Sequence, residues 1–407
     1  MEEWKKYKLG EITSKIGSGA TPKGGRDSYL GGNIALIRSQ NVLDFSFSKL
    51  GLAYINEVQA EKLSNVEVYE KDVLLNITGD SVARVCIVPN NVLPARVNQH
   101  VAIIRGNDKV DYRYLLYYLQ YIKPQLLSLS QGGATRNALT KKMIEELEVK
   151  MPSKGIQKEI VSILYALDSK IELNRRINDN LEQQTQALFK SWFVDNPKPN
   201  WSETTFSEVA NFIGGYSYKG EELTDSSNIA MVTIKNFGRN GGFKADGFKG
   251  IAPFVKLKEC HYANLFDILV AHTDLTQNAD VIGNAELLLT YGRYDGIIFS
   301  MDLVKVLPKN NFPYRFLLAA MLKNKIFKGH CLGYVNGTTV LHLSKKALPN
   351  FEVKIPPKAE AKTMNDALAP YYQRMAEVLQ ENDRLIHLRD TCLLYTSPSP
   401  RDRQKSR

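Results

Sequence analysis

Two Glu-x-Lys sequences are the first places where this chain could carry out chemistry. Glu148 and Lys150 form one of them, and Glu352 and Lys354 form the other. Metal-dependent nucleases place such a pair on a strand, where an upstream aspartate is needed to complete the metal site. A proline follows each pair two residues later, which favours the simpler interpretation that a strand ends there. We therefore expect neither pair to be a nuclease centre.

A glycine-rich stretch and one histidine suggest two further kinds of site. "GSGATPKGG" (17–25) resembles a phosphate-binding loop, but it lacks the Gly-Lys-Ser/Thr ending that directs a lysine at the phosphates. His272 lies in "AHTDLT" (271–276), where acid–base work or metal binding would be possible, but a loop that hydrogen-bonds to itself explains it better. The six histidines are too dispersed to form a ligand set by spacing. No methyltransferase, cofactor-turn or helicase motif is present, so we expect a non-catalytic chain with no metal or cofactor of its own.

What remains is a set of polar side chains in loops, able to contact bases and phosphates. Arg and Lys suit guanine edges and phosphates, and Asn and Gln suit adenine. In the first half of the chain the candidates are Thr21, Lys23, Arg38, Ser39, Asn41, Arg84, Asn98, Gln99, Arg136, Asn137 and Lys141. In the second half they are Tyr218, Lys219, Lys235, Asn236, Arg239, Thr273, Thr276, Gln277, Thr338, Thr339 and Lys345. An ordinary solvated surface explains any single one equally well, so the collective pattern carries this prediction.

The composition agrees with an anionic partner. Lysine and arginine total 53 against 43 acidic residues, a formal charge of +10, which favours nucleic acid above all. The chain has 407 residues, enough for two domains of ordinary size. The first residues, "MEEWKKYKLGEI", contain no apolar core of signal-peptide length, no apolar run is long enough to span a membrane, and the four cysteines form no C-x-x-C pair. We therefore expect a cytoplasmic protein with reduced thiols.

A tandem repeat organises the chain. "EVKMPS" (148–153) returns as "EVKIPP" (352–357), and the same offset of 204 relates the whole block 133–189 to 337–393. The start of the chain recurs with an offset of 197, and "DVLLNIT" (72–78) with an offset of 195. The flanks match and the middles differ, which is typical of a duplicated scaffold whose interiors diverged.

Each copy opens with about 150 residues of short apolar runs that predict strands and closes with a long helix. Apolar residues recur there at alternating spacings of four and three, which predicts a pairing seam between the two helices. The seam residues are Ile160, Leu164, Leu167, Ile171, Asn178, Leu181, Leu188, Leu368, Met375, Asn382 and Leu385, with Tyr371 in the same register. We expect antiparallel pairing over roughly 50 Å at 1.5 Å per residue. The alternative is two separate amphipathic helices, each packed on its own domain.

These features resemble the specificity (S) subunit of type I restriction–modification systems. The resemblance rests on the bipartite repeat, on "GATPKGGRDSYLGGNIALIRSQNV" (19–42) and "DVLLNITGD" (72–80), and in the second copy on "GYSYKGEEL" (215–223) and "DILVAHTDLTQNADVIG" (267–283). It implies an α+β fold with two mixed α/β target-recognition domains, separated by two long helices that pair as an antiparallel coiled coil. The implied divisions are recognition domain 1 (1–152), spacer helix 1 (153–195), recognition domain 2 (196–356) and spacer helix 2 (357–393).

The resemblance also implies the partners. Each recognition domain reads one half of a split, asymmetric double-stranded DNA site, and the helices set the unread gap. Two methyltransferase (M) subunits bring S-adenosylmethionine, and restriction (R) subunits add ATP- and Mg²⁺-dependent translocation and cleavage. Residues 394–407, "LYTSPSPRDRQKSR", depart from the repeat, and we expect a non-native tail there.

Two other functions remain open at this stage. One is an enzyme that acts on DNA through the Glu-x-Lys residues, and the other is a helical scaffold that binds no nucleic acid.

Overall fold

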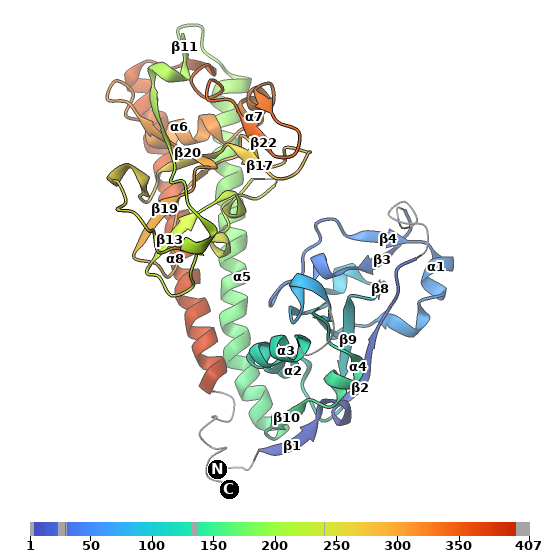
Figure 1. Cartoon of the computed structure of the whole chain (residues 1–407). Coiled ribbons are helices and arrows are strands. Elements are labelled where there is room, and N and C mark those ends of the chain that lie inside the picture. The colour runs from blue at the N-terminus through green and yellow to red at the C-terminus, as the bar shows by residue number, and fades with distance from the viewer. Residues whose placement is uncertain (1–3, 23–28, 30, 132–136, 240, 396–407) are drawn as a thin grey trace. The chain divides into compact units, whose positions relative to one another are not determined.

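A computed structural model describes residues 4–22, 29, 31–131, 137–239 and 241–395. The chain forms two compact units (Figure 1). Unit 1 is built from the residues up to Ser169 together with those from His387 onward, and unit 2 from Lys170 to Ile386. No helix in the described part of the chain is long and apolar enough to cross a membrane.

Unit 1 contains two four-stranded sheets. The first has the order β2-β9-β6-β7 and is antiparallel throughout, with strands β2 (Thr13–Ser18), β9 (Val101–Gly106), β6 (Val73–Asn76) and β7 (Val85–Ile87). The second has the order β4-β3-β8-β5, with strands β4 (Ala53–Ile55), β3 (Ile34–Ile37), β8 (Ala95–Val97) and β5 (Glu67–Val68). A ribbon of β1 (Lys5–Lys8) and β10 (Glu148–Met151) and helices α1 (Glu57–Glu61), α2 (Tyr112–Tyr121), α3 (Lys123–Ser130) and α4 (Lys141–Glu145) complete the unit.

The central strands β6 and β9 are apolar on both faces because both faces are covered. Leu74 and Ile103 belong to the core shared with the second sheet. Val73, Leu75 and Ile104 point the other way and pack in the core that contains helix α2. Successive side chains of a strand alternate between faces, so a continuous Val/Ile/Leu run is what a doubly covered strand requires.

Unit 2 repeats this arrangement. Its first sheet has the order β12-β20-β16-β18, with strands β12 (Ala210–Gly214), β20 (Leu303–Pro308), β16 (Ile268–Ala271) and β18 (Ala285–Leu287). Its second has the order β14-β13-β19-β15, with strands β14 (Lys249–Gly250), β13 (Ile229–Val232), β19 (Gly296–Phe299) and β15 (Tyr262–Ala263). The remaining elements are the ribbon β11 (Ser202–Thr205) with β23 (Glu352–Ile355), the small sheet β17 (Thr273–Asp274), β22 (Leu341–Leu343) and β21 (Val335–Asn336), and helices α6 (Arg315–Leu322) and α7 (Lys325–Leu332).

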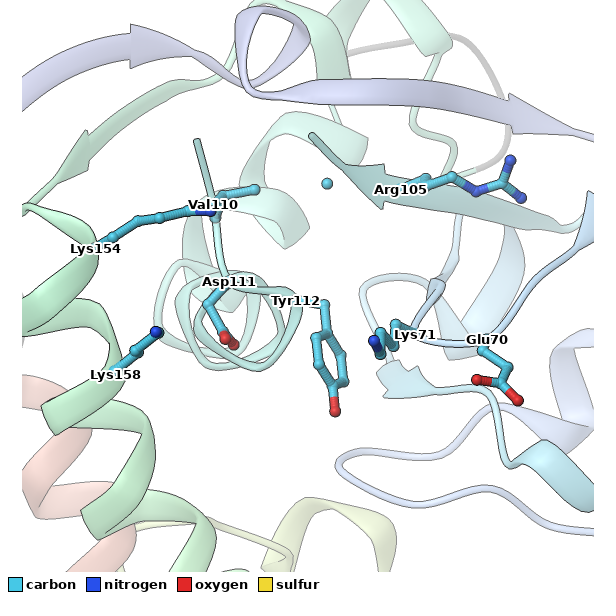
Figure 2. A pocket seen from close by; sticks show the side chains of 9 residues that line it. Glu70, Lys71, Arg105, Val110, Asp111, Tyr112, Lys154 and Lys158 are labelled. Atoms are coloured by element: carbon cyan, nitrogen blue, oxygen red, sulfur yellow. The ribbon is translucent and has the colours of Figure 1, made fainter. Parts of the chain in front are cut away.

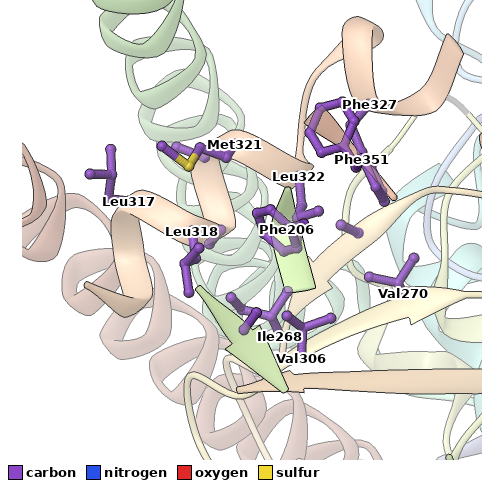
Figure 3. Packing of buried hydrophobic residues seen from close by; sticks show 14 of the residues in the cluster. Phe206, Ile268, Val270, Val306, Leu317, Leu318, Met321, Leu322, Phe327 and Phe351 are labelled. Atoms are coloured by element: carbon purple, nitrogen blue, oxygen red, sulfur yellow. The ribbon is translucent and has the colours of Figure 1, made fainter. Parts of the chain in front are cut away.

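The main core of unit 2 lies between its first sheet and helix α6. Figure 3 shows Ile268, Val270 and Val306 of the sheet together with apolar residues of α6, and Phe206, Phe327 and Phe351 beside them. Phe206 and Phe327 are fully buried. Complete burial of an aliphatic or aromatic side chain of this size contributes about 1.5–3 kcal/mol, so this cluster is a main source of the stability of unit 2.

Matching backbone hydrogen bonds confirm the tandem repeat. The Leu139 N–H donates to the Ile77 carbonyl at 2.8 Å, and the Leu343 N–H donates to the His272 carbonyl at 2.8 Å. These pairs are related by the offsets 204 and 195. The sheet orders also agree, and a parallel strand pair occurs at the same place in both, as β3 with β8 and as β13 with β19. The duplicated sequence therefore folds twice into one scaffold.

Two long helices, α5 (Lys154–Lys190) and α8 (Lys358–Tyr395), pair antiparallel within each unit. In unit 2, Asn174 Nδ2 donates to Asn382 Oδ1 at 2.9 Å, and Asn178 Nδ2 donates to the Met375 carbonyl at 3.4 Å. As the number rises along α5 it falls along α8, as an antiparallel pair requires. A buried asparagine is favourable where its amide finds a partner in only one register, so Asn174 and Asn382 specify how the helices align.

The seam differs from the prediction at one aromatic residue. Tyr372 is fully buried in the core of unit 2, whereas Tyr371 is only half-buried. The spacing from Met364 to Met375 is therefore four, four and three instead of four, three and four, and the shift occurs directly after Pro370, which lies inside α8. Proline removes a helix hydrogen bond and displaces the carbonyl one turn earlier, which accounts for a local change of phase.

The other seam residues differ in their burial. Leu164, Ile171, Leu368, Met375 and Asn382 are buried. Ile160, Leu181 and Leu188 pack against the cores while partly exposed, and Leu167, Asn178 and Leu385 are half-buried. After α5, a π-helical turn (Ser191–Asp195) ends the helical segment, and α8 continues to Tyr395, two residues beyond the predicted end of spacer helix 2.

Candidate nucleic-acid interface

One end of the first sheet of unit 1 gathers four loops. Strand β6 ends there and β9 begins there, and backbone hydrogen bonds join the loops: the Ile77 N–H donates to the His100 carbonyl at 3.0 Å and the Gly79 N–H to the Asn137 carbonyl at 3.1 Å. The Gly19 N–H donates to the Asn98 carbonyl at 3.1 Å, which adds the end of β2. We call residues 19–22, 77–84, 98–100 and 137–139 loop cluster 1.

A row of hydrogen-bonded polar side chains runs through loop cluster 1. The Thr21 hydroxyl donates to Gln99 Oε1. Gln99 Nε2 lies 3.0 Å from His100 Nε2, and His100 Nδ1 lies 2.5 Å from Thr78 Oγ1. Thr21 and Gln99 are exposed, so their remaining donors and acceptors reach solvent. The sequence prediction missed His100 and Thr78, although His100 directly follows the predicted Gln99.

Two more predicted residues lie in the same cluster. Asn137 is exposed, and Arg84 is half-buried with its backbone carbonyl accepting from the Asn76 N–H at 2.9 Å. The guanidinium of Arg84 makes no hydrogen bond or ion pair with any residue that the structure describes. Lys141 lies just beyond, on α4, where its ammonium is 3.5 Å from the Glu145 carboxylate. Lys23 and Arg136 fall outside the described residues.

The predicted base contacts by Asn41 and Asn236 are wrong. Both side chains are fully buried. Asn41 Oδ1 accepts the Arg38 N–H at 3.0 Å and its Nδ2 donates to the Ser48 carbonyl at 2.9 Å. Asn236 Oδ1 accepts the Thr233 N–H at 2.9 Å and its Nδ2 donates to the Lys244 carbonyl at 2.9 Å. Their recurrence at the offset of 195 is the signal that could have identified them as scaffold, because the two copies diverge where they differ in function.

Burial also contradicts the predicted base contacts of Asn98 and Thr273. Two other predicted residues, Arg38 and Ser39, are partly engaged by contacts within the protein. Asn98 is buried, and its Oδ1 accepts the His100 N–H at 3.0 Å, so it shapes a turn. Thr273 is buried in strand β17. Arg38 donates to the Gly51 carbonyl and lies over the Tyr29 ring at 5.4 Å, and Ser39 beside it is half-buried.

The same end of the first sheet of unit 2 carries an equivalent set of loops. The Tyr216 N–H donates to the Phe299 carbonyl at 2.8 Å, and β17 pairs with β22. We call residues 215–219, 234–239, 272–284 and 336–345 loop cluster 2. Within it, Gln277 Nε2 donates to the carbonyls of Thr338 at 2.6 Å and Thr339 at 3.3 Å, which ties two loops together.

Asp274 organises the longest of these loops. Its Oδ1 accepts from the Thr276 N–H at 2.8 Å and the Thr276 hydroxyl at 2.9 Å, and its Oδ2 accepts from the Val281 N–H at 2.8 Å. Burial raises the pKa of Asp274, but these hydrogen bonds outweigh it and leave the pKa below its usual value. The carboxylate is thus a fixed anion inside the loop.

The predicted cations of loop cluster 2 face solvent. The exposed residues are Lys219, Lys235, Arg239, Gln277, Thr338, Thr339 and Lys345. Tyr218 and Thr276 are half-buried, and burial raises the pKa of Tyr218. Arg239 Nε lies 3.8 Å from Asp280 Oδ2. Each unit therefore presents polar and cationic side chains on loops held by a rigid sheet end, an arrangement suited to reading DNA.

His272, also in loop cluster 2, predicts a pH-dependent stability. Burial lowers its pKa to about 4, and its Nε2 has no hydrogen-bond partner among the described residues. The unfolded pKa is 6.5, so the folded state excludes the proton. Stability is then complete above pH 6.5 and falls as the pH drops toward 4, by about 2 kcal/mol at pH 5.

The replacement His272→Ile tests this prediction, because Ile77 occupies the equivalent place in the first copy. We expect the variant to unfold at the same or a higher urea concentration than the native chain at pH 7 and to lose less stability than the native chain at pH 5. Equal losses in both proteins would show that His272 is not the titrating group.

A separate pocket of about 340 Å³ lies at the opposite end of the β9 strand (Figure 2). Figure 2 shows Lys154 and Lys158 of α5 on one side of Tyr112 and Lys71 on the other. Arg105, at the edge of the pocket, forms an ion pair with Asp72, to which its Nε and Nη2 donate at 2.7 and 2.8 Å. The whole length of β9 separates this pocket from loop cluster 1, so the two are distinct features.

The Glu-x-Lys residues lie on the two-stranded ribbons. Glu148 is opposite Lys8 in the β1–β10 ribbon, and Glu352 is opposite Thr205 in β11–β23. Among the described residues, no group of three or more His, Cys, Asp or Glu side chains is placed to hold a metal ion.

Comparisons with known proteins agree with this arrangement. The family model for the type I restriction modification DNA specificity domain matches residues 1–183 and 198–386. The HindI specificity subunit of Haemophilus influenzae is 29% identical over 202 residues, which are 48% of this chain and 42% of that protein. The chain thus matches less than half the length of that relative. The MjaIX specificity subunit of Methanocaldococcus jannaschii is 23% identical over 416 residues, covering 96% of this chain and 92% of that one.

A solved structure shares the fold. The S subunit of a type I restriction–modification system from M. genitalium aligns with a TM-score of 0.55 at 15% identity, over 98% of this chain and 97% of that chain. With a family model matching each of its two copies, the chain belongs to the type I restriction–modification DNA specificity family.

Proposed function

We propose that this chain is the DNA-reading subunit of a type I restriction–modification complex, with one half-site read by each unit. The observation that carries the proposal is the recurrence of one loop cluster at the same sheet end in both copies. The backbone hydrogen bonds of the clusters match, whereas the exposed side chains differ. A duplicated scaffold with divergent loops is what recognition of two different half-sites demands.

The chemistry is assigned to partner subunits. We propose that two M subunits, carrying S-adenosylmethionine, dock on the paired helices, and that R subunits supply ATP- and Mg²⁺-dependent steps. The helix pair then sets the unread gap between half-sites, which at roughly 50 Å corresponds to at most about 15 base pairs. This chain contributes recognition and spacing and no catalytic group.

Mapping of methylated adenines is the direct test. DNA from cells that express the chain with its neighbouring M subunit should carry methylation in a split motif, two short half-sites with a fixed gap. Lack of methylation beside an M subunit shown to be active with another S chain would contradict the proposal. An intrinsic Mg²⁺-dependent nick that disappears in Glu148→Gln and Glu352→Gln variants would favour an enzyme instead.

Arg84→Ala is expected to weaken binding of the cognate duplex about tenfold in the assembled complex, since its guanidinium is uncommitted in loop cluster 1. A fluorescence titration at several salt concentrations measures this. Arg293→Ala is the matched control, because Arg293 is an exposed arginine that lies outside both loop clusters and off the paired helices. Equal affinities for the two variants would remove Arg84 from the interface.

A further inference from the structure

Glycines on both sides of the exposed Arg239 lie at the end of segment 234–239 of loop cluster 2 and just beyond it. We call Gly238, Arg239, Gly241 and Gly242 the glycine turn. The Gly238 N–H donates to the Gly242 carbonyl at 2.9 Å, and the Gly241 N–H donates to the Gly238 carbonyl at 3.0 Å. Gly241 and Gly242 have φ angles of +87° and +91°, which L-residues with a side chain rarely adopt. Gly241 and Gly242 therefore adopt backbone conformations that favour glycine.

Two buried side chains hold the glycine turn at both ends. Asn284 Nδ2 donates to the Gly238 carbonyl at 2.7 Å, and Glu286 Oε1 accepts the Gly242 N–H at 2.6 Å. Asn284 is 8% exposed and Glu286 is 2% exposed. Glu286 lies on β18 and Asn284 immediately precedes that strand, and both side chains contact the glycine turn.

Glu286 carries its carboxylate in the protein interior, where an unpaired charge would destabilise the fold. Its side chain is 3% exposed, and Lys323, itself 6% exposed, pairs with it. Lys323 also lies 3.0 Å from Glu182 of helix α5. Burying a charge is unfavourable unless it is paired and hydrogen-bonded. Here Lys323 pairs with Glu286 and donates to its Oε2, and the Gly242 N–H of the glycine turn donates to its Oε1.

The first copy holds the corresponding loop by different means. The Ala83 N–H donates to the Asn76 carbonyl at 2.8 Å and the Gly283 N–H donates to the Ala271 carbonyl at 2.9 Å, so residues 84 and 86 correspond to residues 284 and 286. Those places are occupied by Arg84 and Cys86. Asn76 instead fixes the loop by donating to the Ser39 carbonyl at 2.9 Å. The Asn284–Glu286 pair is therefore particular to the second copy, as expected of residues that serve one half-site.

Asp280 also helps to orient the Arg239 side chain. Its Nε lies 3.8 Å from Asp280 Oδ2, and Lys328 Nζ donates to the backbone carbonyl of Asp280. Lys328 Nζ donates as well to Asn284 Oδ1 at 2.7 Å. The residue that holds one end of the glycine turn is thus linked to the residue that faces the Arg239 guanidinium.

We propose that Asn284 and Glu286 are positioning residues that present Arg239 to a guanine edge in the second half-site. The proposal rests on the proposed function. Arginine contacts guanine O6 and N7 with two parallel hydrogen bonds, and this requires a backbone placed within a small tolerance. A turn fixed at both ends by buried groups supplies that placement, whereas a contact with phosphate alone would not need it.

The test is adenine-methylation mapping with the native chain and four variants, each expressed with the M subunit. Arg239→Ala removes the reading group, Asn284→Ala removes one support, and Glu286→Met with Lys323→Met removes the other without leaving an unpaired lysine. Cys86→Ala, at the place in the first copy that corresponds to Glu286, is the matched control. For the first three we expect methylation at sites altered in one base pair of the second half-site to rise at least about tenfold relative to the cognate site. The first half-site and the gap should not change.

Each outcome decides the proposal. A parallel fall of methylation at all sites, with the motif intact, would show that the pair only stabilises the fold and would overturn it. An unchanged motif in Arg239→Ala, or the same relaxation in Cys86→Ala, would overturn it as well. Asn284→Ala keeps the Glu286–Lys323 pair and so answers the question if the double variant does not accumulate. If the native chain gives no split motif, the proposed function itself fails.

Discussion

Replacing Lys323 by methionine is expected to destabilise unit 2 by about 3 to 5 kcal/mol. The ammonium pairs with Glu286 and Glu182, whose side chains are 3% and 17% exposed. Methionine has a similar volume but no charge, so the variant leaves two carboxylates close together and largely shielded from water. Removal of one partner of a buried ion pair costs far more than the net contribution of the pair, because the remaining charge is uncompensated.

The pH dependence of this loss has a definite sign. Burial raises the pKa of Glu286 in the native chain, and Lys323 opposes that rise. In the variant the folded pKa lies further above the unfolded value, so the destabilisation is present above the folded pKa. It disappears as the pH falls below the unfolded pKa, because both states are then protonated. The deficit should therefore shrink as the pH falls toward the unfolded pKa of the glutamate.

Peptide-resolved hydrogen–deuterium exchange measures the loss of stability separately in unit 2 and in unit 1. Peptides from β18 and α6 should lose protection, while peptides from β6 and β9 of unit 1 serve as an internal reference. The double variant Lys323→Met with Glu286→Met should recover part of the stability, since Glu182 alone is partly exposed. Equal protection in native chain and single variant, or a deficit that grows as the pH falls, would contradict the buried-charge account.

The architecture could be predicted from the sequence, because the tandem repeat and the helix seam both appear as periodic patterns of residues. The offsets of 204 and 195 predicted a scaffold built twice, and the matching bonds at Ile77 and His272 confirm it. The spacing of four and three predicted the helix seam, since Leu164, Ile171 and Leu368 face a core at every turn. Such patterns depend only on which side of an element is buried.

The candidate site was harder to predict from the sequence, because no periodic pattern shows which polar side chains form hydrogen bonds inside the fold. Asn41 and Gln99 are both polar residues near turns, yet one is fully buried and the other exposed. The Glu182–Lys323–Glu286 cluster joins a helix, a loop and a strand far apart in the chain, and no local pattern connects them. His100 and Thr78 likewise meet only after two strands are placed side by side.

Arg389→Ala is expected to destabilise unit 1 by about 2 to 4 kcal/mol. The Arg389 side chain is 9% exposed, and its Nη1 lies 3.0 Å from Asp168 Oδ1 on α5. Its guanidinium also stacks over the Phe45 ring at 3.6 Å. The Tyr117 hydroxyl donates to the other oxygen of Asp168 at 2.7 Å, so one carboxylate connects α2 with both long helices.

A double-mutant cycle isolates this contact. Asp168→Asn keeps an acceptor for Tyr117 but removes the charge, so the coupling with Arg389→Ala reports the ion pair itself and should reach about 1 to 3 kcal/mol. Arg384→Ala is the control, because Arg384 is an exposed arginine of the same helix and its loss should change stability by less than about 0.5 kcal/mol. Exchange of peptides from α2 and the first turns of α5 gives the readout. If Arg389→Ala behaves like Arg384→Ala, the apolar contact of Leu393 with the core of unit 1 must hold this end of α8 instead.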